Sequence, residues 1–234
     1  MTDLRAVLTD IEGTTTPLSF VLDVLFPFAR RRLDVACTSA CGGDSRFAEA
    51  LRLLRQEHEA ERASGANLPD FGDGAPYAHF LMDQDRKSTG LKALQGLLWE
   101  DGYRAGELRG PVYPDVAAAL RAWRERGIRV RVFSSGSVLA QKLLFGHSDQ
   151  GDLLPFFEGF HDTTTGPKQE PDSYRTIAAD FDLPAAGILF LSDVTAELDA
   201  ARAAGMRTGL LVRPGNRPAE PNGHPIHHSF SELV

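Results

Sequence analysis

The stretch AVLTDIEGT, residues 6–14, decides the fold class of this 234-residue chain. Its first four residues are apolar or β-branched, as is typical of a short buried strand, and the acidic residues Asp10 and Glu12 follow at once. An aspartate in this place is more often a turn or helix-capping residue than a catalytic one, so the stretch alone does not assign a function. It predicts a buried strand whose carboxyl end carries two carboxylates.

From residue 111 onward, helical and strand patterns alternate. Apolar runs predict strands at 128–133, 187–191 and 208–212. Helical spacing and helix-end signals predict helices at 114–126, after residue 137, at 171–181 and at 194–204. Strands separated by single helices favour right-handed crossovers, and hence an α/β fold with a parallel sheet covered on both faces. The residues after Arg213, rich in Pro, Gly, Asn and His, are predicted to be irregular.

Residues 20–107 have a different pattern. Apolar residues recur at helical spacing in 20–36, 46–62 and 91–105, and no strand pattern interrupts them. Breaks rich in Gly or Pro at 42–43 and 63–76 separate these segments. We therefore predict a core made of residues 1–19 and 108–234, with an all-helical insertion at residues 20–107.

The composition excludes several classes of partner. The net charge is −7 and the basic residues are dispersed, whereas binding to nucleic acid draws on clustered Lys and Arg. No apolar run approaches the roughly 20 residues that span a bilayer, and no cleavable signal is evident. Cys37 and Cys41 are the only cysteines and lack the paired histidines of a zinc site. We expect a cytoplasmic protein without a membrane or nucleic-acid partner, and a monomer is compatible with the sequence.

Three of the predicted strands are followed by polar residues. Asp10 and Glu12 follow the first strand, Ser134 follows the second and Asp193 follows the third. Ligands of open parallel sheets bind outside the carboxyl ends of the strands. We therefore expect these side chains to meet at one edge of the sheet.

This set of residues suits phosphoryl transfer from a small phosphorylated metabolite. Asp10 and Asp193 offer the carboxylate oxygens that Mg²⁺ prefers, and the metal would lessen the repulsion between an anionic nucleophile and an anionic phosphate. Asp10 is then predicted to attack phosphorus and form an aspartyl-phosphate. Ser134 and Lys168, the latter in a loop just before the helix at 171–181, are predicted to bind the phosphate oxygens.

Glu12, two residues beyond Asp10, is predicted to act as acid and base. It would protonate the leaving-group oxygen and later deprotonate the attacking water, a contribution of roughly 10²–10⁴-fold in rate. Taken singly, the other residues have plainer interpretations: Ser134 as part of a helix cap, Lys168 as a solvated surface charge and Asp193 as a helix N-cap. Their order and their shared place after predicted strands favour the catalytic interpretation.

The chain resembles the haloacid-dehalogenase superfamily of phosphotransferases. Asp10 with Glu12, Ser134, Lys168 and Asp193 match its four motifs in order, except that Glu12 stands where the usual first motif has Asp. Three longer segments are similar to the acireductone synthases, the enolase-phosphatase family of methionine salvage: DIEGTTTPLSFV (10–21), LKALQGLLWEDGYRAGEL (91–108) and FSSGSVLAQKLLFGHS (133–148).

This resemblance implies a Rossmann-like core with an all-helical cap inserted after the first strand. It implies enolisation and then dephosphorylation of 2,3-diketo-5-methylthiopentyl 1-phosphate to the acireductone. It also implies that Ser134 and Ser135 bind substrate, that Lys168 binds the phosphate, and that the Glu12 backbone carbonyl joins Asp10 and Asp193 as a ligand of Mg²⁺.

Some points stay open at this stage. Glu197, one helical turn beyond Asp193, is either part of the site or a solvated helix residue, and His147 and His161 are more often structural than catalytic. Pro167 directly before Lys168 departs from the family pattern and leaves the shape of that loop undetermined. The rival functions are a phosphatase of the same superfamily that acts on another metabolite, and a catalytically silent binding module.

Overall fold

The computed structural model describes residues 3–41, 45–86 and 88–234. The chain divides into two compact units, one made of Met1–Val21 with Arg109–Val234 and the other of Leu22–Leu108. The sequence placed these two breaks after residues 19 and 107. We describe each unit by itself, the first as the sheet unit and the second as the helical unit.

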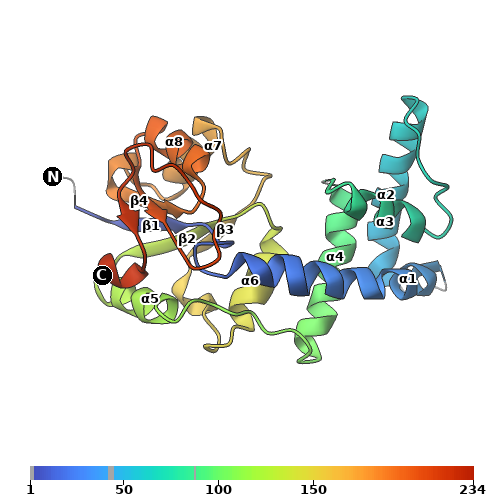
Figure 1. Ribbon diagram of the computed structural model, residues 1–234, viewed down its shortest axis with the longest axis horizontal. Helices are drawn as coiled ribbons and strands as arrows, with labels where there is room; N and C mark the ends of the chain where they lie inside the picture. Colours follow the sequence, from blue (N-terminus) through green and yellow to red (C-terminus); the bar gives the residue numbers. More distant parts are fainter. Residues whose placement is uncertain (1–2, 42–44, 87) are drawn as a thin grey trace. The chain divides into compact units, whose positions relative to one another are not determined.

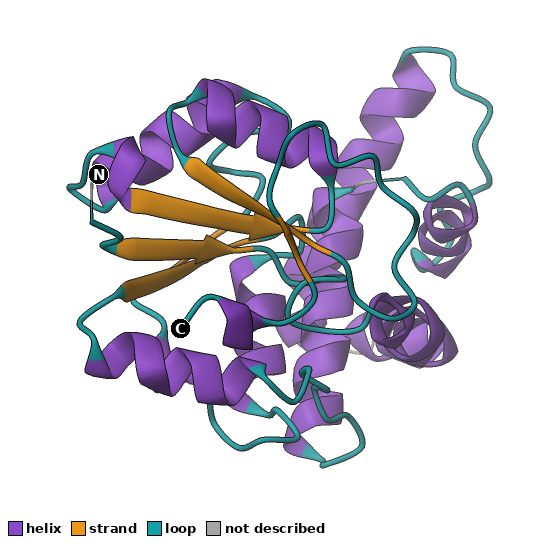
Figure 2. Ribbon diagram, turned by 60° about the vertical axis from the view of Figure 1, so that its left-hand side comes forward, coloured by secondary structure: helices purple, strands orange, loops and turns teal. Residues whose placement is uncertain are grey.

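The sheet unit is built on six parallel strands in the order β3-β2-β1-β4-β5-β6 (Figure 2). The strands are β1 (Ala6–Thr9), β2 (Arg129–Phe133), β3 (Gly159–His161), β4 (Ile188–Ser192), β5 (Arg207–Leu211) and β6 (Ile226–His227). All four residues of β1 are buried, which explains their unbroken apolar or β-branched character. The predicted parallel α/β fold is confirmed.

Helices cover both faces of this sheet (Figure 1). They are α5 (Val116–Glu125), α6 (Val138–Gly146), α7 (Pro171–Asp180) and α8 (Thr195–Ala203). On one face α7 and α8 pack on a cluster that includes Tyr174, whose ring centroid lies 5.0 Å from that of Phe190. On the side of α5, the ring centroid of the fully buried Trp123 lies 5.3 Å from that of Phe230. Truncation of such a side chain to Ala lowers the free energy of unfolding by about 3–5 kcal/mol.

The prediction that the residues after Arg213 are irregular is wrong in part. Ile226–His227 forms β6 against β5, with Leu210 opposite Ile226, and Phe230–Glu232 forms a short 3₁₀ turn. A strand of two residues has no detectable alternation, so its position depends on pairing with β5 rather than on a local pattern. Three other short elements were also not predicted: β3 and the 3₁₀ turns Leu154–Phe156 and Ala185–Gly187.

The helical unit consists, in its described residues, of helices without strands. A π-helical turn (Phe20–Leu25) leads into α1 (Phe26–Cys41), and α2 (Ser45–Ala63), α3 (Ala75–Asp83) and α4 (Thr89–Arg104) follow. The predicted break at 42–43 lies outside the described residues, and the second predicted break ends where α3 begins. Gly90 allows α4 to approach α2 closely, because a Cβ there would lie 2.4 Å from the Leu54 backbone nitrogen.

The interior of the helical unit includes a buried indole. Trp99 is buried and its indole N–H donates to the Leu25 carbonyl at 2.9 Å, so it stabilises the unit internally. Across the described residues, none of the helices has the length and apolar character needed to cross a bilayer.

Candidate active site

Asp10 lies at the carboxyl edge of the sheet, directly after its central strand. β1 pairs with β2 on one side and β4 on the other, and the Asp10 N–H donates to the Leu191 carbonyl at 2.9 Å. The side chain is buried. The register places the residues that follow β2 and β4 on either side of Asp10, which is the arrangement that a topological switch point creates.

Lys168 makes the closest contacts of this site. Its Nζ lies 2.6 Å from Asp10 Oδ1 and 2.7 Å from Glu197 Oε2, and only 8% of the residue is exposed. Burial alone would lower the pKa of Lys168, but the carboxylates of Asp10 and Glu197 raise it well above its usual value. The ammonium therefore stays charged at neutral pH. The interpretation of Lys168 as a solvated surface charge is wrong, because two carboxylates hold it inside the protein.

The loop before α7 places Lys168 in this position. The Tyr174 hydroxyl donates to the Lys168 carbonyl at 2.7 Å, and the Ser173 hydroxyl donates to the Pro167 carbonyl at 2.7 Å. Gly166 has a φ of +143°, and a Cβ there would lie 2.3 Å from Ser173 Oγ. The first turn of α7 thus determines the loop shape that the sequence left open, with Pro167 accommodated.

Glu197 belongs to this cluster rather than to the solvated face of α8. It is 8% exposed, and it accepts a hydrogen bond from Ser192 Oγ at 3.0 Å in addition to its contact with Lys168. Burial, followed by the charge of Asp10, raises the pKa of Glu197 to about 7, and Lys168 opposes this shift. Of the two possibilities left open for this residue, the structure supports the first.

Glu12 and Ser134 contact each other across the ends of β1 and β2. Ser134 Oγ donates to Glu12 Oε2 at 3.1 Å and accepts from the Gly136 N–H at 3.2 Å. Burial, and next the charge of Asp10, raises the pKa of Glu12. Ser135 follows in the same turn, half-buried. The N-cap of α6 is Ser137, whose Oγ accepts from the Ala140 N–H, so Ser134 is not the capping residue.

Asp193 is brought against the loop after β1. A Cβ placed on Gly13, whose φ is +71°, would lie 2.2 Å from Asp193 Oδ2, so only glycine allows this approach. Burial, and next the charge of Asp10, raises the pKa of Asp193 to about 7. The N-cap position of α8 is Val194, so the alternative of Asp193 as its N-cap is wrong.

The charges of this cluster are unbalanced. Among the residues that the structure describes, the carboxyl groups of Asp10, Glu12, Asp193 and Glu197 interact with one ammonium group, that of Lys168. Such an excess of buried oxygen ligands suits a hard divalent cation. Among the described residues, no three His, Cys, Asp or Glu side chains gather in the geometry of a metal site. A cation here would therefore complete its shell with backbone, water or phosphate oxygens.

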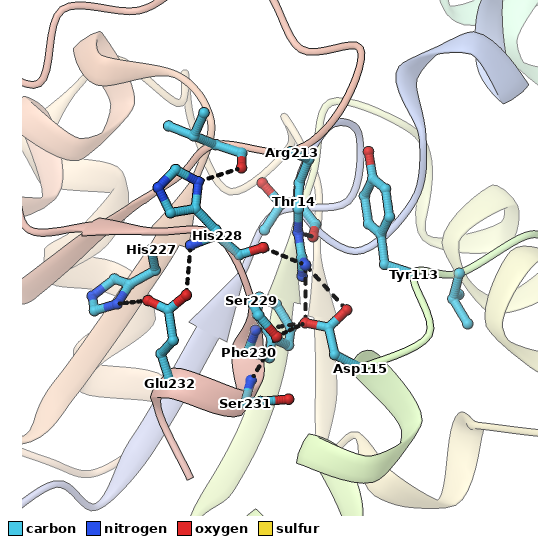
Figure 3. A network of polar contacts seen from close by, with 12 residues as sticks. Thr14, Tyr113, Asp115, Arg213, His227, His228, Ser229, Phe230, Ser231 and Glu232 are labelled. Carbon is cyan, nitrogen blue, oxygen red and sulfur yellow. Dashed lines mark hydrogen bonds and ion pairs between the residues drawn. The ribbon is translucent and has the colours of Figure 1, made fainter.

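Sequence reasoning missed the residues that hold the loop after Glu12. Asn216 Nδ2 donates to the Gly13 carbonyl at 2.9 Å. Arg213 Nε donates to the Thr14 carbonyl at 3.2 Å (Figure 3). Their only local signal is an arginine directly after an apolar strand. Asp115, at the start of α5, makes no side-chain cap and instead accepts hydrogen bonds from Arg213.

The two histidines considered as bases lie in other surroundings. His147 Nδ1 contacts the Leu143 carbonyl at 3.1 Å, at the end of α6. His161 Nε2 lies 3.7 Å from Asp180 Oδ2, and burial lowers the pKa of its imidazole. His147 thus makes a local contact within α6, whereas His161 Nε2 makes no hydrogen bond within the described residues. The structural role that the sequence favoured for both stays a prediction.

Comparison with known proteins gives two levels of relationship. The family model of haloacid dehalogenase-like hydrolases matches residues 4–205. Enolase-phosphatase E1 of Synechococcus elongatus is 50% identical over 236 residues, covering 98% of both chains. Enolase-phosphatase E1 of Pseudomonas aeruginosa is 50% identical over 232 residues, covering 99% of this chain and 98% of its own.

The chain belongs to the enolase-phosphatase E1 family. It is thus an enzyme, a phosphatase of the haloacid dehalogenase-like hydrolases. The crystal structure of the UTR4 protein of Saccharomyces cerevisiae is similar to it, with a TM-score of 0.79, 34% identity, and coverage of 97% of this chain and 99% of that one. The resemblance read from the three sequence segments is confirmed by these comparisons.

Proposed function

We propose that this member of the enolase-phosphatase E1 family enolises 2,3-diketo-5-methylthiopentyl 1-phosphate and then removes its phosphate, giving the acireductone of methionine salvage. The observation that carries the proposal is the contact between Lys168 and Asp10 at the end of the central strand. It places a permanently charged cation beside a buried carboxylate at the edge where ligands of parallel sheets bind. A phosphate group bound at this edge meets both a nucleophile and a positive charge.

Asp10 acts as the nucleophile of the phosphatase step. One of its carboxylate oxygens attacks phosphorus, the bond from phosphorus to the ester oxygen breaks, and an aspartyl-phosphate forms. The contact with Lys168 orients the Asp10 carboxylate, and the ammonium stabilises the charge on the transferring phosphoryl group. Ser134 and Ser135 bind the substrate beside it.

Glu12 transfers the protons. Its carboxyl group protonates the leaving ester oxygen and then accepts a proton from the water that hydrolyses the aspartyl-phosphate. The raised pKa of Glu12 supports this role, because it favours the protonated carboxyl group, which is the form that can donate a proton. Glu12 is also our candidate for the base of the enolisation, in which a proton leaves C1 and another is added to the carbonyl oxygen at C2.

We assign the metal site to the side chains of Asp10 and Asp193 with the backbone carbonyl of Glu12. The excess of carboxylates over cations supports this assignment, and Mg²⁺ is the expected ion because it favours a few carboxylates together with phosphate and water oxygens. When bound, Mg²⁺ supplies the positive charge that lets an anionic carboxylate approach an anionic phosphate.

The helical unit, Leu22–Leu108, is assigned as the cap over the substrate. Closure of such an insertion excludes water from the reacting groups, which strengthens the electrostatic contacts among them. The expected substrate is a small phosphorylated metabolite, since the phosphate is the group that Lys168 can neutralise.

The test follows enol absorbance and phosphate release together, with the diketone phosphate and Mg²⁺. An enol signal that precedes phosphate release is expected. Asp10→Asn should abolish phosphate release, and equal release from the parent and this variant would refute the mechanism. Phosphate release without an enol signal would instead favour a simple phosphatase of the same superfamily.

A further inference from the structure

The loop that follows Glu12 is held through its backbone carbonyls. Asn216 Nδ2 donates to the carbonyl of Gly13 at 2.9 Å and Arg213 Nε donates to that of Thr14 at 3.2 Å. The backbone N–H of Tyr113 donates to the carbonyl of the next residue, Thr15, at 2.9 Å. Three consecutive carbonyls are therefore bound by donors that lie about 100 or about 200 residues away in the chain.

The other hydrogen bonds of this loop are local. The Thr15 hydroxyl donates to the Ile11 carbonyl at 3.2 Å, and the N–H groups of Thr14, Thr15 and Thr16 donate to the same carbonyl at 3.1, 2.9 and 3.0 Å. The Gly13 N–H donates to the Thr16 carbonyl at 2.8 Å, which closes the turn. The three donors to the carbonyls of residues 13–15 add links from this closed turn to segments that are distant in the chain.

Arg213 is itself held rigidly. Its Nη1 lies 2.9 Å from Asp115 Oδ2 and donates to the His228 carbonyl at 3.0 Å, and its guanidinium lies 4.6 Å from the centroid of the Tyr113 ring. Asp115 is fixed in turn by the Ser229 hydroxyl, at 3.0 Å (Figure 3). A guanidinium with this many partners has one orientation, so its Nε provides a fixed point for the Thr14 carbonyl.

The geometry of Gly13 transmits this constraint to the reacting groups. Gly13 adjoins Glu12 in the chain, has a φ of +71°, and lies against the Asp193 carboxylate. The planar peptide unit between Glu12 and Gly13 contains the Gly13 N–H, which donates to the Thr16 carbonyl at 2.8 Å. Holding the turn at Gly13 and Thr14 therefore restricts the orientation of this peptide unit and, with it, of the Glu12 backbone. The direction of the Glu12 side chain toward Ser134 depends on that backbone.

Asn216 links the loop after Glu12 to the sheet. Its Nδ2 donates to the Gly13 carbonyl at 2.9 Å and to the carbonyl of Leu211, the last residue of β5, at 3.3 Å. One amide group thus connects the turn that carries Gly13 with the end of a neighbouring strand.

We propose that Asn216 and Arg213 are positioning residues that hold Glu12 in place for proton transfer to the leaving oxygen. This inference rests on the proposed role of Glu12 in the phosphatase step. Neither residue touches the reacting atoms, and both act through the carbonyls of Gly13 and Thr14.

The test compares Asn216→Ala with the matched control Asn222→Ala. Asn222 lies in the same C-terminal segment, but its Nδ2 donates to Asp199 on the outer side of α8. Each variant is assayed with Mg²⁺ on two esters: the diketone phosphate and p-nitrophenyl phosphate. Release of the leaving group is measured in the first turnover, because the later hydrolysis of the aspartyl-phosphate uses Glu12 as base with either ester. The second ester releases a stable phenolate that departs without protonation, so this first step does not depend on a well-placed acid.

Asn216→Ala is expected to lower the first-turnover rate of leaving-group release from the diketone phosphate by about 10- to 100-fold, because small misplacements of a catalytic group have effects of that order. KM for this ester and the first-turnover release of p-nitrophenolate should change by less than about threefold, and Asn222→Ala should match the parent on both esters. Arg213→Lys keeps the positive charge beside Asp115, but an ammonium group cannot reach the Asp115 carboxylate and the carbonyls of Thr14 and His228 together. This variant should therefore show the same selective loss. If Asn216→Ala proves unfolded by thermal denaturation, Arg213→Lys decides on the same criterion.

Equal losses on the two esters, or no loss on either, would overturn the inference, since a general structural defect does not distinguish leaving groups. So would a loss of the same size in Asn222→Ala. If the parent hydrolyses p-nitrophenyl phosphate but Glu12→Gln is as active as the parent on the diketone phosphate, the proposed role of Glu12 fails, and the inference fails with it.

Discussion

Replacement of Gly13 by alanine separates local backbone strain from displacement of the reacting groups. Gly13 has a φ of +71°, and a Cβ there would lie 2.2 Å from Asp193 Oδ2 and 2.6 Å from its Cγ. Ordinary contact begins near 3.4 Å, so the carboxylate would have to move by about 1.2 Å. Gly127, after α5, has a φ of +69° with nothing within 4 Å of its would-be Cβ, and it serves as the matched control.

The two substitutions share one cost and differ in the other. Alanine in the left-handed region costs about 1–2 kcal/mol, which shifts Tm by about 2–4 °C per kcal/mol in a protein of this size. Gly127→Ala should show this shift and no change in phosphate release. Gly13→Ala should lose about 100-fold in kcat/KM as well, because it displaces Asp193 by about an ångström.

Calorimetry and phosphate release, measured on the same preparations, check this expectation. Gly13→Ala with activity within about threefold of Gly127→Ala would show that the position of Asp193 does not matter for the reaction, and the assignment of the site would then be wrong. A similar loss of activity in Gly127→Ala would equally contradict the reasoning, since nothing surrounds that position.

Three further predictions follow from the charges. Lys168→Met should lower the rate of phosphate release by about 10²–10³-fold, as removal of one transition-state donor commonly does. Lys142 lies on the exposed face of α6, so Lys142→Met should leave this rate unchanged in the same assay. Mg²⁺ at about 100 times its dissociation constant should raise the free energy of unfolding of the parent protein by about 2.7 kcal/mol. A thermal-shift titration should show a smaller rise for Asp193→Asn, and an equal rise in both proteins would contradict the metal assignment. Burial would by itself raise the pKa of Asp115, but the Phe230 N–H and Arg213 lower this pKa overall. The ionised Asp115 carboxylate therefore stabilises the folded protein above the unfolded pKa near 3.9, and this stabilisation is lost as pH falls through the lower folded pKa. The difference in unfolding free energy between the parent and Asp115→Asn should accordingly be constant from pH 7 to about 5 and shrink below about pH 4; a difference that does not depend on pH would contradict this.

The fold was predictable from the sequence because its signals are local. The apolar run at β1 and the alternation of helices and strands after residue 111 depend on neighbouring residues, and the topology rule then brings the ends of β1, β2 and β4 together. The positions of Glu12, Ser134 and Asp193 after strands or next to them follow from the same rule. Lys168 follows none of the predicted strands; the need for a positive charge beside the phosphate and its place in a loop before a helix indicated it, and the motif resemblance then agreed.

The contacts that were not predicted connect distant parts of the chain. Asn216 and Gly13 are 203 residues apart, and Arg213 and Thr14 are 199 apart, with no periodic pattern to relate them. β6 has two residues, fewer than any periodic signal requires. Glu197 was left undecided because its place on α8 relative to Lys168 depends on how α8 packs on the sheet.

The order of the strands has a consequence for synthesis of the protein on the ribosome. β1 emerges first, yet both of its neighbours come much later, with Ala6 opposite Arg129 on one side and Ile188 on the other. The segment Leu22–Leu108 is continuous and can form its helices early, whereas β1 stays without partners during most of translation. The strand that precedes Asp10 therefore acquires its second neighbour only after β4, at Ile188–Ser192, has left the ribosome.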